Sequence, residues 1–267
     1  MKDNYPRREK VSAAIITLNE ERNLHRCLKS IAWVDEIIIV DAGSTDRTVQ
    51  IGEEAGAKVY YRPWPGFAKQ WENAINLCSN NWILLLEADT EIEPELVEEI
   101  QEVLVSPGET RGFCLLYKNF FLGKWIRYCG WYPSPKLRLF RKDSVRVIHR
   151  EVHENFTVVP YIVKELSRGH VKHYSYHSLH QYLKKFNNYT DLDALEMFKT
   201  NANTSFSEKD LFKVFSKKFN EMYHQKEGFK DGLHGYVLCY LSAFYEFIKI
   251  AKFLELKGGF DYPGDPQ

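Results

Sequence analysis

The sequence carries no excess charge of either sign, because its 36 lysines and arginines equal its 36 aspartates and glutamates. Proteins that bind nucleic acid usually show a basic footprint, so we expect no nucleic-acid partner. Cysteines are few and widely spaced, and none forms a Cys-x-x-Cys pair. This spacing argues against a disulfide framework or a cysteine zinc site, and it favours a reducing, cytoplasmic compartment.

Long apolar runs are also lacking. No segment has the roughly 18 uninterrupted apolar residues of a membrane span, and residues 1–10 lack the apolar stretch of a secretory signal. Two nucleotide-binding signatures are missing as well: the Gly-x-Gly-x-x-Gly turn of dinucleotide enzymes and the Gly-Lys-Ser/Thr loop of P-loop enzymes. The sequence therefore argues against a membrane-spanning protein and against both of these enzyme classes.

The first hundred residues alternate between short apolar runs and segments with helical spacing. This alternation predicts an α/β fold with a mostly parallel sheet covered by helices on both faces. In such sheets the ligand lies beyond the carboxyl ends of the strands. The predicted strands are Val11–Leu18, Glu36–Val40, Lys58–Tyr61 and Trp82–Leu86, and the helices are Asn23–Ile31, Thr48–Ala55, Phe67–Cys78 and Pro94 to about Leu104.

The rest of the chain changes character twice. The middle section reads as strands without long helices between them, and helical spacing dominates from Ser178 onward. This change predicts a sheet-bearing domain over residues 1–177 and a helical C-terminal region over residues 178–267. The predicted strands of the middle section are Gly112–Tyr117, Leu137–Phe140, Val145–Ile148 and Val171–Tyr174.

An acidic segment, Glu87-Ala88-Asp89, directly follows the apolar run that ends at Leu86. If the extended geometry persists, the two carboxylates point to the same side of the strand. Paired carboxylates at an open strand end suit a divalent cation such as Mg²⁺ or Mn²⁺. The alternative is an acidic loop that favours the N-terminus of the following helix, together with Glu91 and Glu93.

Polar residues follow the first two strands as well. Thr17-Leu18-Asn19-Glu20 ends the first, and Asp41 through Asp46 end the second. Asp41 can accept hydrogen bonds from a base or ribose, while Gly43 and Ser44 permit a tight turn with outward N–H groups. Each residue also has a local reading, Asn19 as a turn residue and Ser44 as a helix cap. Three polar strand ends at one edge favour a nucleotide site.

The segments Val11–Glu21 and Val34–Asp46 resemble the start of family 2 glycosyltransferases, which have the GT-A fold. The pattern is most similar to that of bacterial lipopolysaccharide core glucosyltransferases, and it extends from residue 11 to about residue 255. The later matching segments are Asn119–Trp125, Gly130–Pro133, Leu137–Arg141, Val152–Glu154, His173–Tyr176 and Gly228–Gly232.

The resemblance implies a Rossmann-like sheet with flanking helices and a C-terminal helical extension. It also implies inverting transfer of a hexose, glucose in the closest family, from a nucleotide-sugar such as a UDP-sugar. The acceptor would be a glycolipid or oligosaccharide of the lipopolysaccharide core or another cell-envelope glycan. Such an enzyme would lie in the cytoplasm, on the inner face of the cell membrane.

The resemblance also assigns site residues. Glu87-Ala88-Asp89 occupies the place of the acidic metal motif, and His173 matches a histidine that completes the metal coordination. Glu154 matches the general base, with the adjacent His153 as the alternative. Two further side chains belong to the expected donor site: Lys69 as a cationic contact and Trp131 as a platform that stacks on a sugar face, although Trp131 also suits a core position.

Two positions depart from the family pattern. Glu87 stands where relatives carry aspartate, and Trp71-Glu72 stands where they carry a cationic residue followed by asparagine. These departures favour an alternative function, a non-catalytic GT-A-like protein that binds a nucleotide or a partner. Glu87 keeps the charge of an aspartate, but its extra methylene moves the carboxylate by about a bond length.

The C-terminal helices combine lysines with aromatic residues, for example Lys213 and Lys217 beside Phe212 and Phe215. Basic, aromatic helices are typical of proteins that lie on a membrane surface. The alternatives are a helical cap on the core and a homodimer contact.

Overall fold

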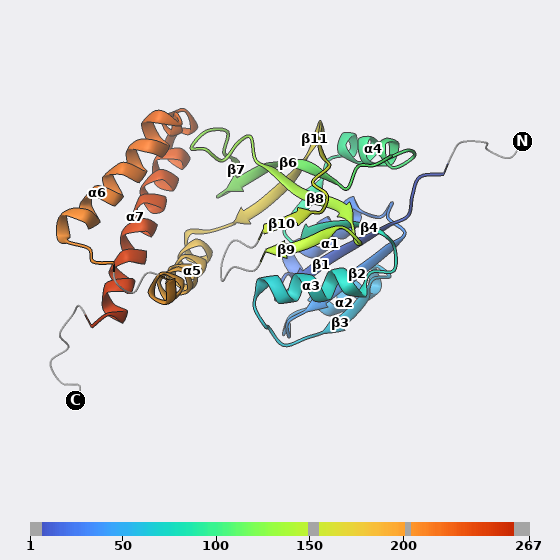
Figure 1. Cartoon of the computed structure of the whole chain (residues 1–267), viewed down its shortest axis with the longest axis horizontal. Helices are drawn as coiled ribbons and strands as arrows, with labels where there is room; N and C mark the ends of the chain where they lie inside the picture. Colours follow the sequence, from blue (N-terminus) through green and yellow to red (C-terminus); the bar gives the residue numbers. More distant parts are fainter. Residues whose placement is uncertain (1–6, 149–154, 201–203, 259–267) are drawn as a thin grey trace, which may run out of the picture. The chain divides into compact units, whose positions relative to one another are not determined.

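A computed structural model describes residues 7–148, 155–200 and 204–258 (Figure 1). The chain divides into two compact units. Unit 1 comprises Met1–Lys118 and Pro133–Tyr174, and unit 2 comprises Asn119–Tyr132 and Ser175–Gln267. The predicted functional division at residue 177 stays a prediction.

Unit 1 is built on a sheet in the order β3-β2-β1-β4-β8-β6-β11-β5. Strand β1 is parallel to β2 and β4, and β2 is parallel to β3, whereas β8 is antiparallel to both β4 and β6. The predicted α/β fold is confirmed. The strands are β1 (Val11–Thr17), β2 (Glu36–Asp41), β3 (Lys58–Tyr61), β4 (Trp82–Glu87), β5 (Thr90–Ile92), β6 (Gly112–Phe121), β8 (Pro135–Arg141) and β11 (Val163–Tyr176); β9 (Val145–Ile148) and β10 (Asn155–Val158) form a separate antiparallel pair.

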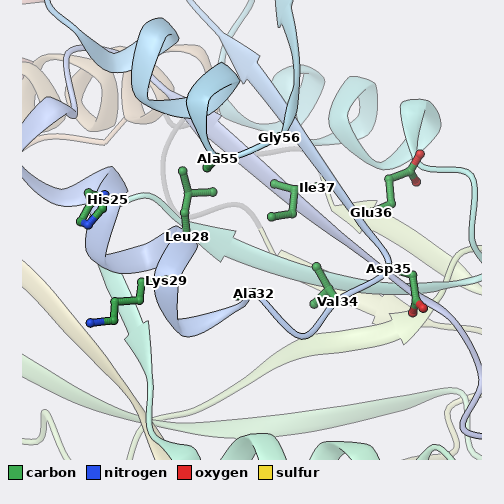
Figure 2. Close-up of a pocket in the computed structure, with 10 residues that line it drawn as sticks. All are labelled: His25, Leu28, Lys29, Ala32, Val34, Asp35, Glu36, Ile37, Ala55 and Gly56. Carbon is green, nitrogen blue, oxygen red and sulfur yellow. The ribbon is translucent and has the colours of Figure 1, made fainter.

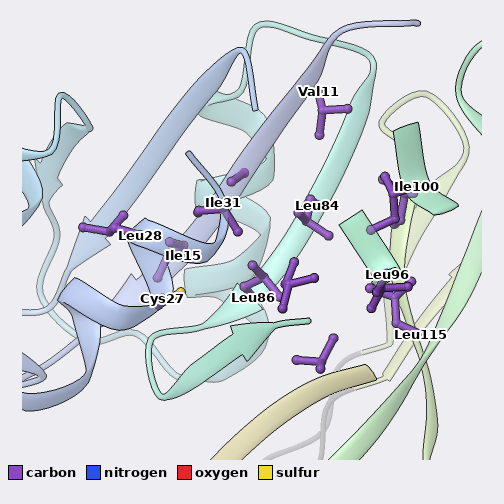
Figure 3. Close-up of a cluster of buried hydrophobic side chains, with 14 of the residues drawn as sticks. Val11, Ile15, Cys27, Leu28, Ile31, Leu84, Leu86, Leu96, Ile100 and Leu115 are labelled. Carbon is purple, nitrogen blue, oxygen red and sulfur yellow. The ribbon is translucent and has the colours of Figure 1, made fainter. Parts of the chain in front are cut away.

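Successive side chains of a strand point to opposite faces of the sheet. Both faces of this sheet are covered, so both sets of side chains are buried. On β1, Ala13 and Ile15 lie in the cluster that includes residues of α1 (Glu21–Ser30) and α4 (Pro94–Val103), as Figure 3 shows. The neighbouring Ala14 lies in the opposite cluster, with residues of α3 (Phe67–Leu77). Burial of each large aliphatic side chain contributes about 1.5–3 kcal/mol. The apolar run of β1 therefore anchors helices on both faces.

Helix α1 follows the spacing that the sequence predicts. Leu24, Cys27, Leu28 and Ile31 recur at helical intervals and are all buried, which places one side of the helix against the sheet. The short helix α2 (Thr48–Glu54) contributes Ile51 to the same cluster. Because β1 and β2 are parallel, the loops that follow them lie at the same edge of the sheet, the carboxyl edge.

Several elements differ from the prediction. Strands β5, β10 and the two-residue β7 (Lys124–Trp125) were not predicted, and β6 and β11 are longer than expected. The expected extension of β4 through Asp89 is wrong, because β4 ends at Glu87 and Ala88-Asp89 form a turn. The Thr90 hydroxyl donates to the Glu87 carbonyl at 2.7 Å, which stabilises this turn.

Unit 2 is mainly helical, with α5 (Leu179–Thr200), α6 (Glu208–Asn220) and α7 (Gly232–Leu256). A π-helical turn (Glu221–Gln225) and a 3₁₀ turn (Gly228–Asp231) connect the last two. The buried Asp231 carboxylate accepts the backbone N–H of Tyr128 at 2.8 Å. This bond fixes the segment Asn119–Tyr132 to the helices. Among the described residues, none of the helices is long and apolar enough to cross a membrane.

Candidate active site

The loop after β2 is organised by Asp41, the last residue of that strand. Its buried carboxylate accepts the backbone N–H groups of Gly43 at 2.9 Å and Ser44 at 2.7 Å. It also accepts the Thr17 hydroxyl at 2.8 Å, which joins the ends of β1 and β2. Gly43 has φ of +105°, a conformation that favours glycine. The carboxylate therefore fixes the turn that the sequence predicts.

The loop after β1 is tied to the same turn. The Asn19 N–H donates to the Ser44 hydroxyl at 2.7 Å, and the Asn19 side-chain oxygen accepts the Thr45 N–H at 2.8 Å. Leu18 is about half exposed, and Glu20 accepts a hydrogen bond from the side chain of Asn23. The predicted donor-binding residues of the two strand ends thus belong to one connected pair of loops.

Glu87 lies among positively charged side chains. Its Oε1 is 2.8 Å from Arg138 Nη2 and 3.8 Å from Lys136 Nζ, and its Oε2 accepts the Tyr117 hydroxyl at 3.1 Å. Burial raises the pKa of the Glu87 carboxyl, but the positive charges of Arg138 and Lys136 outweigh burial and hold that pKa well below its usual range. The carboxylate is therefore ionised at neutral pH and bound by the protein's own cations.

Asp89 has a different partner. The backbone N–H of Tyr174 donates to the Asp89 carbonyl at 2.9 Å, and His173 Nε2 lies 3.3 Å from Asp89 Oδ1. The antiparallel register of β5 and β11 sets Thr90 opposite His173, which brings the histidine to the end of β4. Asp89 is mostly buried, at 7% exposure. The structure thus unites two predicted metal ligands that are remote in sequence.

The Asp89–His173 pair fits a divalent cation by its chemistry. One carboxylate and one imidazole are donors that Mn²⁺ accepts, and diphosphate oxygens or water can occupy the remaining positions. Within residues 7–148, 155–200 and 204–258, no group of three or more histidine, cysteine, aspartate or glutamate side chains is arranged to hold a metal. Glu87 therefore does not form a three-residue metal site with Asp89 and His173 among the described residues. Its two carboxylate oxygens already accept hydrogen bonds from Arg138 and Tyr117.

The remaining predicted residues lie elsewhere. Lys69 is exposed on α3. Trp71, which together with Glu72 departs from the family pattern, is buried and packs edge-on against Phe156, with ring centroids 6.3 Å apart. Trp131 belongs to unit 2, where its half-buried ring packs edge-on against Phe121 at 6.3 Å. The predicted base Glu154 and its neighbour His153 lie outside the described residues.

Three residues around Glu87 were not predicted: Tyr117, Lys136 and Arg138. Lys136 and Arg138 alternate with Leu137 and Leu139. This period of two is typical of a strand that has charged side chains on one face and apolar side chains on the other. That alternation was a usable signal, because the direct pairing of β8 with β4 places the charged side beside the end of β4.

A cavity of about 370 Å³ lies between the end of α1 and the start of β2 (Figure 2). Its two carboxylates are already bound by the protein: Asp35 by Arg8 and by the Val11 N–H, and Glu36 by Lys58. The cavity adjoins the amino end of β2, whereas ligands of such sheets bind at the carboxyl ends. It is therefore distinct from the predicted nucleotide site.

Polar strand ends that meet at the carboxyl edge of a mostly parallel sheet define the chain as an α/β protein of the class that binds ligands at this edge. Residues 12–149 match the sequence profile described as Glycosyl transferase family 2. The chain is 32% identical over 263 residues to an uncharacterized glycosyltransferase of Rickettsia typhi, a match that covers 93% of this chain and 88% of that protein.

The chain is also 30% identical over 251 residues to the lipopolysaccharide core biosynthesis glycosyltransferase LpsC of Rhizobium meliloti, with 91% of each chain covered. The crystal structure of S. aureus TarS 1-349 in complex with UDP-GlcNAc aligns with 94% of this chain and 91% of that chain, at 15% identity and a TM-score of 0.47. The chain belongs to glycosyltransferase family 2. The expected GT-A fold and transferase class are thereby confirmed.

Proposed function

We propose that the protein transfers a hexose from a UDP-sugar to a cell-envelope glycan and inverts the anomeric configuration. The observation that carries this proposal is the Asp89–His173 pair, with its 3.3 Å separation, beyond the end of β4. The connected loops of Asn19 and Ser44 follow β1 and β2, and β1 lies between β2 and β4 in the same sheet. This combination suits a diphosphate bound with a cation and a nucleoside bound on the neighbouring loops.

In the proposed reaction, Asp89 and His173 would hold Mg²⁺ or Mn²⁺. The cation, when bound, neutralises charge that develops on the leaving diphosphate. The acceptor hydroxyl attacks the anomeric carbon while the bond to the diphosphate oxygen breaks. Glu154 takes the hydroxyl proton as general base, with His153 as the alternative. Asp41 keeps the loop of Gly43 and Ser44 in place beside the nucleoside.

The acceptor that we propose is the lipopolysaccharide core or another lipid-linked envelope glycan. The similarity to LpsC over nearly the full length of both chains supports this class of acceptor. An acceptor of that kind is carried by a lipid, so the enzyme would work on the cytoplasmic face of the cell membrane. Glucose is the sugar that the family resemblance favours.

The test is a transfer assay with the purified full-length chain, a set of UDP-sugars, and a lipopolysaccharide core acceptor. We expect activity that needs Mn²⁺ or Mg²⁺ and that falls by at least 100-fold in Asp89→Asn and Glu154→Gln. Glu98→Gln, at an exposed position of α4, is the matched control and should retain activity. Full activity of Asp89→Asn would refute the proposed site.

A second candidate is a non-catalytic protein that binds a nucleotide or a partner. The observation that favours it is the engagement of Glu87 by Arg138, which leaves Asp89 and His173, among the described residues, as the candidate donors to a cation. This candidate predicts UDP binding with neither transfer nor hydrolysis of any UDP-sugar. Metal-dependent turnover of a single UDP-sugar would exclude it.

A further inference from the structure

Unit 2 has a strip of exposed apolar residues along α7. Leu233 is 75% exposed, Tyr236 46%, Tyr240 48% and Phe244 37%. Their spacings of three, four and four residues place them on one side of the helix. Contiguous apolar surface of this kind on a soluble domain marks a site of interaction.

A groove of about 420 Å³ continues the strip onto α6. It lies where Phe244 and Phe247 of α7 meet Leu211, Phe212 and Phe215 of α6, and its lining is mostly apolar, although Glu208 at the start of α6 also lines it. Phe212 is 72% exposed beside the groove. The strip and the groove together form one surface, which we call the α6–α7 face.

Helix α6 also carries a row of lysines. Lys209, Lys213 and Lys217 are spaced four residues apart on α6, and all three are exposed. In the parts of the chain that the structure describes, none of the three lies within salt-bridge distance of an acidic side chain, whereas Lys218 and Lys226 both pair with Glu221. The row thus adds exposed positive charge to the helix that carries Phe212 and Phe215.

We propose that the α6–α7 face docks on an anionic lipid surface, with the aromatic side chains among acyl chains and the lysines at lipid phosphates. Apolar and basic groups side by side on surface helices are what such docking requires. The inference rests on the proposed function for its lipid-linked acceptor.

The experiment is co-sedimentation of the full chain with vesicles of phosphatidylcholine, with and without phosphatidylglycerol. We expect binding that needs phosphatidylglycerol and weakens as salt screens the lysines. Replacing Lys209, Lys213 and Lys217 together by glutamine should weaken binding roughly 100-fold. Phe212→Ser and Leu233→Ser should each weaken it severalfold at unchanged net charge.

The matched control is replacement of three exposed lysines of unit 1, Lys10, Lys29 and Lys164, by glutamine. It alters the net charge equally and should leave vesicle binding within about twofold, because the sheet-bearing unit lacks the apolar face. Equal binding to both vesicle types, or wild-type binding by the triple α6 variant, would overturn the inference. So would a dimer in sedimentation velocity that Leu233→Ser dissociates without any vesicle binding.

Vesicle binding is measured without a sugar donor, so its outcome is independent of turnover. An active enzyme that ignores phosphatidylglycerol vesicles would refute the docking face alone. A chain that binds vesicles but transfers no sugar would refute the proposed function alone.

Discussion

Arg138 Nη2 lies 2.8 Å from Glu87 Oε1, so the residue that departs from the family's aspartate is held by an arginine of the neighbouring strand. The extra methylene of a glutamate lengthens its reach, and this length lets the Glu87 carboxylate meet both Arg138 and the Tyr117 hydroxyl. We infer that Glu87 orders the end of β4 and β8, while Asp89 faces His173.

Breaking this pair should destabilise the protein. Arg138→Met leaves the Glu87 carboxylate partly buried without its main partner, which we expect to cost about 2 kcal/mol of unfolding free energy. The measurement is urea denaturation followed by circular dichroism. Arg168→Met is the control, since Arg168 pairs with Glu102 at an exposed position and should contribute less than about 1 kcal/mol. Equal losses in the two variants would contradict this role of Arg138.

Substitutions of Asp89 and of Glu87 should differ in their effect on metal-dependent UDP binding. Asp89→Asn and His173→Gln should each weaken Mn²⁺-dependent UDP binding by tenfold or more, because each removes a donor to the cation. Glu87→Gln should change it by less than about threefold. Isothermal titration with UDP, with and without Mn²⁺, measures the effect. A Glu87→Gln loss as large as that of Asp89→Asn would make Glu87 a ligand after all.

The turn that follows β2 depends on Asp41. Asp41→Asn replaces an acceptor oxygen by an amide that faces N–H and O–H donors of Ser44 and Thr17, which should cost about 1–3 kcal/mol. Binding of UDP should weaken in parallel. Thermal unfolding and UDP titration of the same variant test both effects. Thr45→Ala, at an exposed position of the same loop, is the control and should be close to wild type in stability.

Stability below neutral pH should depend on Glu36. Burial raises the pKa of the Glu36 carboxyl, but hydrogen bonds from Lys58, Ser12 and Ser79 lower it by a larger amount, so that the pKa falls to about 2. A lowered folded-state pKa stabilises the protein above the unfolded-state pKa of about 4.3, here on the order of 3 kcal/mol. This contribution is lost as pH falls from about 4 towards 2.

The test compares wild type with Glu36→Gln in urea at pH 7 and at pH 3. The stability difference should be largest at pH 7 and should fall by about half at pH 3. Glu53→Gln, at an exposed position of α2, controls for the loss of one negative charge. A difference that stays constant between the two pH values would show that Glu36 is not stabilised as its carboxylate.

The parallel half of the sheet could be predicted from the sequence because its signals are local. Apolar runs ended by polar residues located β1 to β4 to within one residue, and Asn19, Asp41 and Ser44 followed from the same pattern. Strand β5 could not be predicted, because three residues, Thr90–Ile92, become a strand only by pairing with β11. The contact of Arg138 with Glu87 depends likewise on non-local pairing. The family resemblance, rather than periodicity, linked His173 to Asp89.

The pairing of β5 with β11 also bears on the order in which the protein acquires its abilities. Synthesis proceeds from the N-terminus, so β1, β2 and the loop of Asp41 can assemble before the chain reaches residue 173. Asp89 gains its imidazole neighbour only when β11 adds to the sheet, a step that closes a long loop and is slow for that reason. A nascent or truncated chain that ends before β11 would have the loops of Asn19 and Asp41 without the Asp89–His173 pair. Cation-dependent binding of a diphosphate, if the proposed site is right, would therefore report that β11 has joined the sheet.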